Sequence, residues 1–506
     1  MRRLFIFVFS LTLIAISASA QQQQPAASSP VFKRFRPLIL YAPYDGIGAQ
    51  LWQGFQLIQK SNAGDPLAQH ELGVRYFTGQ GFPRDTAKAV YWIKKAADHE
   101  LPIAQYNYGV FLNNGWGVDW NPFEGYKYVR LAADQQMTEA IFLLGLTFTD
   151  NMVVNRDMDK AYALVKIAAT RDYAPAKEVL AEMDRRGLTP GRKSEARESA
   201  PQQDTTILSN RYQPVFLDFG ESNGTASSDE VFLSDSLIHN NSQLRRALGM
   251  SVIADSSKDT LRGVPLVRYA ANVGSPEALV LLGKWYEKGI YVKKDILAAA
   301  EYYVRAFRLD SPRAPGALAE LLKLKEFFPL MKARVEKNDA SAMYIWSALV
   351  SAKFDYQLTE PQALKLLQRS AKENHLPALI ELGFCYYRGK WIARDTAQAL
   401  GYWQRASELG SREARLRILA FEILSQKLVD PLLIRELKEG EDNGSVLSQL
   451  ALAYCYQNGL GVPINIAEAA RLYRTCAQRG NQNGYEELKQ LYDALRPPEK
   501  EFKIAD

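Results

Sequence analysis

The chain has 506 residues, of which 47% are hydrophobic and 23% are charged, a globular composition that excludes a wholly disordered protein. This length is too great for one compact core and predicts several domains or an extended array. The formal net charge is only +6, and without a dense Lys/Arg run it argues against a nucleic-acid-binding protein.

The first 20 residues have the parts of a secretory signal peptide. Arg2 and Arg3 precede the apolar run LFIFVFSLTLIAI, and small residues follow at Ala18 and Ala20. Cleavage after Ala20 predicts an exported protein, periplasmic or secreted, whose mature chain has no membrane span. An uncleaved N-terminal anchor is the alternative, although this run is short for a spanning helix. Residues 21–47 follow and are expected to be irregular.

From residue 48 onward, a pattern of about 36 residues repeats in two blocks, 48–187 and 242–496. Within a copy, apolar residues recur at helical spacing, a turn follows, and a second helical pattern completes the unit. Stacked units of this kind predict an all-α protein, a right-handed α-solenoid of helix–turn–helix repeats. A final helix is expected to cap the second block, and residues 497–506 form a tail. Copies begin at Ala68, Ala104 and Ala140, and again at Ala278, Ala378 and Ser448.

Four sets of residues give the repeat its expected structure. Glycine inside the first helix lets the second helix approach closely, and a glycine after that helix can take the left-handed conformation that ends it. An Asp or Asn then stands where the second helix needs an N-cap, and alanines are expected at the helix contacts. The inner glycines are Gly73, Gly109, Gly283 and Gly383, the terminating glycines Gly79 and Gly459, the caps Asp85, Asn121, Asp295, Asp395 and Asn465, and the alanines Ala68 and Ala96.

The pattern A-x-x-x-L-G-x-x-Y-x-x-G-x-G, followed by D-x-x-K-A-x-x-W-x-x-K-A-A, resembles the Sel1-like repeat (SLR), a relative of the tetratricopeptide repeat. The resemblance covers most of residues 68–187 and 242–484. Members of this family commonly act as adaptors in bacterial envelopes, in host–microbe interaction and in eukaryotic quality control of the secretory pathway. The resemblance therefore implies a protein that holds other molecules.

Residues 188–241 interrupt the repeats. The segment begins polar and Pro-containing, as linkers do, and then carries two apolar stretches at 207–219 and 231–238. These stretches predict a short hairpin or extended segment packed on the solenoid, or else a flexible tether with apolar patches. A partner-binding motif is the third option.

The sequence contains no motif of a known catalytic or metal-binding type. None of the four histidines stands near another at metal-ligand spacing. A G-x-S-x-G elbow, a phosphate-binding loop and a dinucleotide fingerprint are all absent, so we expect no enzyme activity, no metal and no cofactor. Three cysteines do not make a disulfide framework, and we expect them in the core, with a Cys455–Cys476 bridge left open.

A stripe beside the buried side of the first helices is the candidate binding surface. With Leu72 facing the core, helical geometry places residues 71, 75 and 78 on this stripe. Aromatic and Arg side chains there suit recognition of a peptide or a glycan, and packing of the aromatic residues against the next repeat is the alternative. The stripe includes Glu71, Arg75, Asn107, Phe111, Trp285 and Lys288.

Together these features predict a non-enzymatic, exported scaffold or adaptor. Its expected partners are proteins and cell-envelope material such as peptidoglycan or another glycan, and not nucleic acid. Uninterrupted copies after a simple signal favour a bacterial source. Two alternatives remain: a peptidoglycan- or β-lactam-directed hydrolase carried on the solenoid, and an adaptor in the endoplasmic reticulum lumen of a eukaryote.

Overall fold

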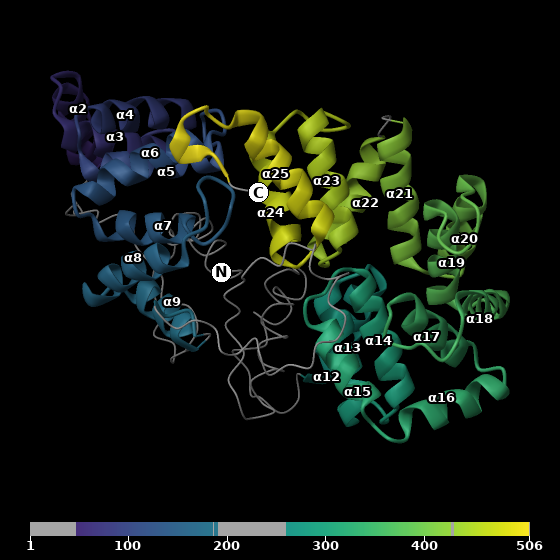
Figure 1. Cartoon of the computed structure of the whole chain (residues 1–506). Helices are drawn as coiled ribbons and strands as arrows, with labels where there is room; N and C mark the ends of the chain where they lie inside the picture. Colours follow the sequence, from purple (N-terminus) through teal and green to yellow (C-terminus); the bar gives the residue numbers. More distant parts are fainter. Residues whose placement is uncertain (1–46, 186, 191–259, 427–429, 505–506) are drawn as a thin grey trace. The chain divides into compact units, whose positions relative to one another are not determined.

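The computed structural model describes residues 47–185, 187–190, 260–426 and 430–504. The expected signal peptide, residues 21–46 and both apolar stretches of the 188–241 segment lie outside these residues. In the described residues all regular structure is helical and no strand occurs. The chain divides into two compact units (Figure 1).

Unit 1 comprises Met1–Phe219 and Glu487–Asp506, and each helix between residues 47 and 185 packs on the next one along the chain. Its C-terminal part holds the end of α25 (Gln482–Leu495) and the 3₁₀ turn η3 (Lys500–Phe502). The other helices are α2 (Ile47–Asn62), α3 (Pro66–Thr78), α4 (Thr86–Asp98), α5 (Pro102–Asn114), α6 (Pro122–Asp134), α7 (Thr138–Thr147), α8 (Met158–Thr170) and α9 (Ala174–Arg185).

Unit 2 comprises Gly220–Glu486 and continues the same helix-pair architecture. One pair is short, and α14 packs directly on α17 as well as on α15. Its helices are α12 (Thr260–Asn272), α13 (Pro276–Lys288), α14 (Ile296–Arg308), α15 (Ala314–Leu322), α16 (Phe327–Glu336), α17 (Ala340–Ser351), α18 (Glu360–Lys372), α19 (Leu376–Arg388), α20 (Thr396–Glu408), α21 (Arg412–Gln426), α22 (Pro431–Asp442), α23 (Val446–Asn458) and α24 (Ile466–Gln478). The predicted all-α solenoid of helical repeats is confirmed.

Side chains cap most of the second helices, and in the clear copies they do so at the same repeat position. Asp85 Oδ1 accepts a hydrogen bond from the Lys88 amide at 2.9 Å, and Asp395 Oδ1 accepts one from the Gln398 amide at 3.0 Å. Each cap satisfies an amide that a helix start leaves without a partner. Equivalent caps begin α6, α14 and α24, at Asn121, Asp295 and Asn465.

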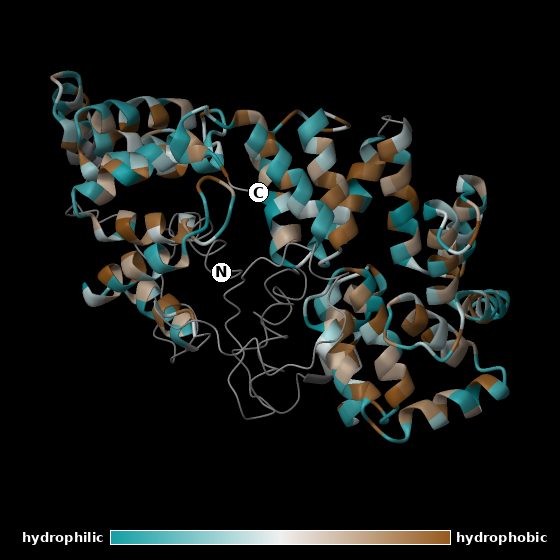
Figure 2. Ribbon diagram, viewed as in Figure 1, coloured by the Kyte–Doolittle hydropathy of each residue, from teal (hydrophilic) through white to brown (hydrophobic). Residues whose placement is uncertain are grey.

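Glycine ends five of the described first helices, α3, α5, α13, α19 and α23, and also lets paired helices approach closely. Gly79 and Gly459 follow α3 and α23 with φ of 78° and 70°, in the left-handed region that favours glycine. A Cβ at Gly383 would lie 2.3 Å from Nε1 of Trp403, so only glycine fits this contact. Similarly close contacts occur at Gly73, Gly109 and Gly283, and Ala68 and Ala96 are buried. Hydrophobic and hydrophilic residues alternate along single helices, as amphipathic packing requires (Figure 2).

Unit 2 curves until its last copy contacts its first complete pair, α13 and α14. Arg479, after α24, donates to both carboxylate oxygens of Glu277 in α13, at 2.9 and 2.5 Å, although 202 residues separate the two. The guanidinium also donates to Oε1 of Gln449 and to the carbonyl oxygen of Gly444. The side chains of Arg479 and Glu277 are 2% and 7% exposed. All three guanidinium nitrogens therefore donate hydrogen bonds, and two of them, Nε and Nη2, form a buried, bidentate ion pair with Glu277.

Further contacts join the same early and late parts of unit 2. Arg305 of α14 pairs with Glu413 of α21, with 3.3 Å between Nη2 and Oε2. Asn272 at the end of α12 donates to the carbonyl oxygen of Gly410 and accepts from the Arg412 amide. These polar contacts link segments that sequence periodicity treats as separate copies.

The three cysteines are buried and free, so Cys455 and Cys476 are not bonded to each other. Burial raises the pKa of each thiol, to about 12 for Cys385 and Cys476 and to about 11 for Cys455. The thiols are thus small core groups that stay protonated at neutral pH. Separately, none of the described helices combines the length and apolarity needed to cross a bilayer.

Candidate binding surfaces

The polar residues predicted on the first helices are largely engaged within unit 1. Arg75 pairs with Glu71 one turn away on α3, with 2.5 Å between Nη2 and Oε1. Asn107 of α5 lies beside His70 of α3, with 2.7 Å between Nδ2 and Nε2. Burial lowers the pKa of His70 to about 4, so the ring is neutral at pH 7 and can accept a hydrogen bond from the Asn107 amide. This contact joins two neighbouring copies.

Both aromatic residues of the predicted stripe are buried. Phe111 and Trp285 are 5% and 7% exposed. The ring of Phe111 packs edge-on against Phe77 at 4.8 Å between centroids, and that of Trp285 packs against Tyr291 at 5.1 Å. These rings therefore pack the fold, which was the alternative raised from the sequence, and they do not face solvent as a binding stripe requires. Lys288 is exposed, and partner binding by the polar residues of the stripe stays a prediction.

A different surface of unit 1, on the second helix α6, holds the C-terminal segment of the chain. Phe502 in η3 is 1% exposed, and its ring centroid lies 5.3 Å from that of Phe123 and 5.8 Å from that of Tyr126. Tyr492 of α25 also packs edge-on against Trp120 and Phe123. Edge-on aromatic pairs add about 0.5–1.5 kcal/mol each beyond the burial of apolar area, so Phe502 is the anchor of this segment.

Charged groups flank the aromatic anchor. Glu501 accepts a hydrogen bond from the Tyr126 hydroxyl at 2.8 Å and pairs with Arg130, while Glu499 pairs with Lys127 at 3.4 Å. Burial acts to raise the pKa of Glu501, but the bonds from Tyr126 and Arg130 outweigh it and hold this pKa below its usual value. We call the receiving surface the α6 face, and it consists of Phe123, Tyr126, Lys127 and Arg130.

The turn between α7 and α8 binds the backbone of the same segment. Asn155 Nδ2 donates to the carbonyl oxygen of Lys503 at 2.7 Å. Arg496 donates to the carbonyl oxygens of Met152 and Phe502, at 2.9 and 2.8 Å. An open pocket adjoins this contact and is lined by residues 154–160 with Tyr126, Phe148 and Glu501. Unit 1 thus contacts both the side chains and the backbone of the C-terminal segment.

The α6 face has a sequence signal that helical periodicity alone did not reveal. Trp120 and Phe123 occupy repeat positions at which the neighbouring copies have exposed residues. Here the two aromatic side chains are only 6% and 1% exposed. The matching residues are Arg84 and Arg156 for Trp120, and Ala87 and Asp159 for Phe123.

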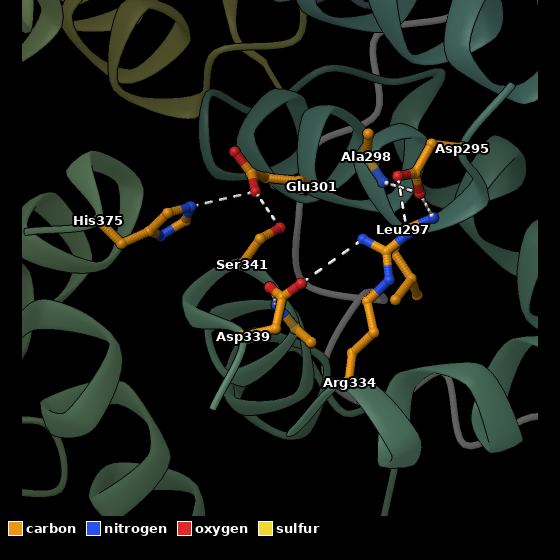
Figure 3. A network of polar contacts seen from close by, with 9 residues as sticks. Asp295, Leu297, Ala298, Glu301, Arg334, Asp339, Ser341 and His375 are labelled. Carbon is orange, nitrogen blue, oxygen red and sulfur yellow. Dashed lines mark hydrogen bonds and ion pairs between the residues drawn. The ribbon is translucent and has the colours of Figure 1, made fainter. Parts of the chain in front are cut away.

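Unit 2 contains a polar network that spans three copies (Figure 3). Oε2 of Glu301, in α14, accepts a hydrogen bond from Ser341 Oγ at 2.5 Å and lies 3.2 Å from Nε2 of His375. Beside it, Arg334 pairs with both Asp295 and Asp339. Burial acts to raise the pKa of Glu301, but the contacts with His375 and Ser341 outweigh it and lower this pKa. The carboxylate is therefore charged at neutral pH.

The order of groups in this network differs from that of a catalytic triad. A triad places the imidazole between the hydroxyl and the carboxylate, so that it can take the hydroxyl proton. Here the carboxylate of Glu301 lies between Ser341 and His375, so the network serves to join copies. Among the described residues, no group of three or more His, Cys, Asp or Glu side chains is placed to hold a metal ion.

Seven segments of the chain match the family model of the Sel1 repeat, at residues 66–100, 102–137, 138–173, 276–311, 360–375, 376–411 and 446–481. The chain contains Sel1-like repeats. The matches fall on the helix pairs α3–α4, α5–α6, α7–α8, α13–α14, α19–α20 and α23–α24, with a shorter match on α18. The family predicted from the glycine, alanine and N-cap positions is therefore confirmed.

Known proteins similar to this Sel1-like repeat protein come from several sources. Mouse DAP3-binding cell death enhancer 1 is 23% identical over 244 residues, which are 39% of the chain and 47% of the relative. The chain thus spans about half the length of this curated relative. A protective antigen with an SLR fold from uropathogenic Escherichia coli is 18% identical, with a TM-score of 0.29, over 87% of this chain and 83% of that one. A Sel1 repeat protein from Oxalobacter formigenes is 28% identical, with a TM-score of 0.24, over 25% of this chain and 96% of that one.

Proposed function

We propose that this Sel1-like repeat protein is a non-enzymatic, exported scaffold that binds protein partners on the surface of its helical units. The seven matched segments carry the proposal, because Sel1 repeats indicate a protein-interaction scaffold. Stacked helix pairs offer extended surfaces whose shape is fixed by alanine and glycine contacts beneath them. Binding of protein rather than glycan is favoured by the α6 face, which already holds a polypeptide segment.

Export rests on residues 1–20, with their charged start, apolar run and small residues before Gln21. Sequencing the N-terminus of the protein recovered from its native cells tests this part. A mature chain that begins at Gln21 supports export with cleavage. An intact N-terminus in the membrane fraction supports the anchor instead, and an intact N-terminus in the cytosol overturns export.

Partner binding is tested by crosslinking in the native compartment, followed by purification and mass spectrometry. We expect at least one protein in near-stoichiometric amount. The name of the mouse relative describes binding of another protein, and we extend only that general property to this chain. Recovery of the chain alone contradicts the proposal, and retention on isolated peptidoglycan without a protein partner replaces it with glycan binding.

The non-enzymatic part is tested with the purified full chain. Incubation with peptidoglycan and with a β-lactam should give no product above the rate of buffer alone. Turnover that a single substitution abolishes would establish the hydrolase alternative. Substitution of Ser341 is the informative choice, since it carries the hydroxyl of the Glu301 network.

A further inference from the structure

We propose that the α6 face of unit 1 is a binding site for peptide segments in which glutamates precede an aromatic residue, and that residues 499–503 of this chain are its resident occupant. This inference rests on the proposed scaffold function and names one site and one ligand class for it. The expected partner presents two carboxylates just before a phenylalanine-like anchor, in the manner of the resident Glu-Lys-Glu-Phe.

The contacts of the resident segment are those of a bound peptide. One side chain, Phe502, is 1% exposed and inserts between aromatic rings. Carboxylates beside it meet Lys127 and Arg130, and Asn155 binds the backbone carbonyl of Lys503. An anchored side chain, complementary charge and backbone hydrogen bonds are the elements by which proteins recognise short peptides.

The second argument is that, among the copies that the structure describes in unit 1, only that of α5 and α6 has this surface. Trp120 and Phe123 replace residues that are basic, small or acidic in the neighbouring copies. Two large aromatic side chains at normally exposed positions would create an apolar patch without an occupant. Their presence in a single copy indicates a surface shaped for a ligand, and the ligand chemistry follows from the segment that already fills it.

The third argument is that the resident segment leaves part of the site open and is held by exchangeable contacts. The Arg130–Glu501 pair has side chains 40% and 37% exposed, and exposed pairs contribute little to affinity. Beyond Glu501, the adjoining pocket is lined by Arg156 and Lys160 and also by Asp157 and Asp159, and all four residues are exposed. A longer segment with charges of both signs can use these groups in addition to the α6 face and thereby displace the resident occupant.

The experiment measures binding of a fluorescent peptide of residues 497–506 to the full chain by anisotropy. In the wild type the tethered segment competes at an effective concentration on the order of millimolar, so the free peptide binds weakly. Phe502→Ala empties the anchor position, and peptide affinity should rise by at least about tenfold. Adding Arg130→Glu to this variant should reverse the gain, whereas adding Lys60→Glu, a charge reversal on α2, should not.

A second measurement tests the proposal if the Phe502→Ala chain fails to fold. Glu501→Gln keeps the anchor ring and removes one charge, and trypsin should then cleave after Lys500 and Lys503 at least about fivefold faster than in the wild type. Unchanged cleavage, or equal peptide binding by wild type and Phe502→Ala, overturns the site. Concentration-dependent dimers between the Phe502→Ala chain and added wild-type chain also overturn the site. Such dimers would mean that the α6 face binds the C-terminal segment of a second chain. Crosslinked partners that are retained after Arg130→Glu leave the scaffold function intact and refute only this site.

Discussion

Replacement of Arg479 by methionine is expected to destabilise unit 2 strongly. Methionine keeps an unbranched apolar stem and removes the guanidinium that donates to Glu277, Gln449 and Gly444. The Glu277 side chain is 7% exposed, so the variant deprives a buried carboxylate of the guanidinium that binds both of its oxygens. A buried charge that loses its counter-ion is costly because little then offsets its desolvation.

The size of the effect follows from the burial of the pair. Removing one partner of a buried ion pair costs about 3–5 kcal/mol. In a unit of this size each kcal/mol lowers the Tm by about 2–4 °C, so a fall of about 10 °C is expected. Arg415→Met is the matched control, since Arg415 binds both oxygens of Glu436 at 3.0 and 3.1 Å but is 38% exposed. Its loss should cost about 1 kcal/mol or less.

Urea unfolding and thermal melts of the full chain, followed by far-UV circular dichroism, measure both variants. An Arg479→Met variant that unfolds within about 1 kcal/mol of Arg415→Met would refute the link between burial and cost. The double variant Glu277→Gln/Arg479→Met should recover most of the loss, because it contains no buried charge at this contact. A double variant as unstable as Arg479→Met alone would show that packing, and not charge, dominates.

Other contacts give further measurable outcomes. Gly383→Ala places a Cβ 2.3 Å from Nε1 of Trp403 and should cost about 1–3 kcal/mol by overpacking. Gly401→Ala, whose Cβ meets nothing within 4 Å, should stabilise α20 by about 0.5–1 kcal/mol, and equal Tm values for the two variants would contradict the close-approach argument. Because the folded-state pKa of Glu301 is lowered, its contribution to stability is present above the unfolded pKa of about 4.3 and is lost as the pH falls through the folded pKa. Glu301→Gln should therefore flatten the acid side of the Tm profile, and an unchanged profile would argue against this pairing. Iodoacetamide at about pH 8 should leave the native chain unlabelled and label three thiols after urea, because burial raises their pKa to about 11–12, and native labelling would contradict the buried positions of Cys385, Cys455 and Cys476.

The repeat could be predicted from sequence because its determinants are local. Asp395 caps a helix through an amide three residues away, and Gly459 ends a helix through its own φ of 70°. Such contacts recur in the copies that match the repeat pattern closely. The position of a residue in the repeat therefore indicates its structural role. Gly383 was predicted as a close-approach site for the same reason, although the sequence did not identify Trp403 as the group that approaches it.

The binding surface was harder to predict because it depends on how copies stack. Helical geometry gives the direction of Phe111 and Trp285 around the helix axis, but it does not show that neighbouring groups cover both rings. The α6 face depends on Phe502 and on its neighbour Glu501, which contacts Tyr126 and Arg130 across 375 and 371 residues of sequence. A consensus of the copies also hides Phe123, because this residue is informative only through its difference from the residues at the same position in neighbouring copies.

The contact between Glu277 and Arg479 also has a consequence for synthesis of the chain. The two residues are 202 positions apart, and a ribosome that adds about 5–20 residues per second needs on the order of 10–40 s to cover that distance. Earlier helix pairs can form as they emerge, since their caps and packing partners are nearby. The closed form of unit 2 must nevertheless wait until its last copy has left the ribosome. Formation of the contact between Arg479 and Glu277 is therefore a late step in folding during synthesis, whatever the order in which the preceding copies fold.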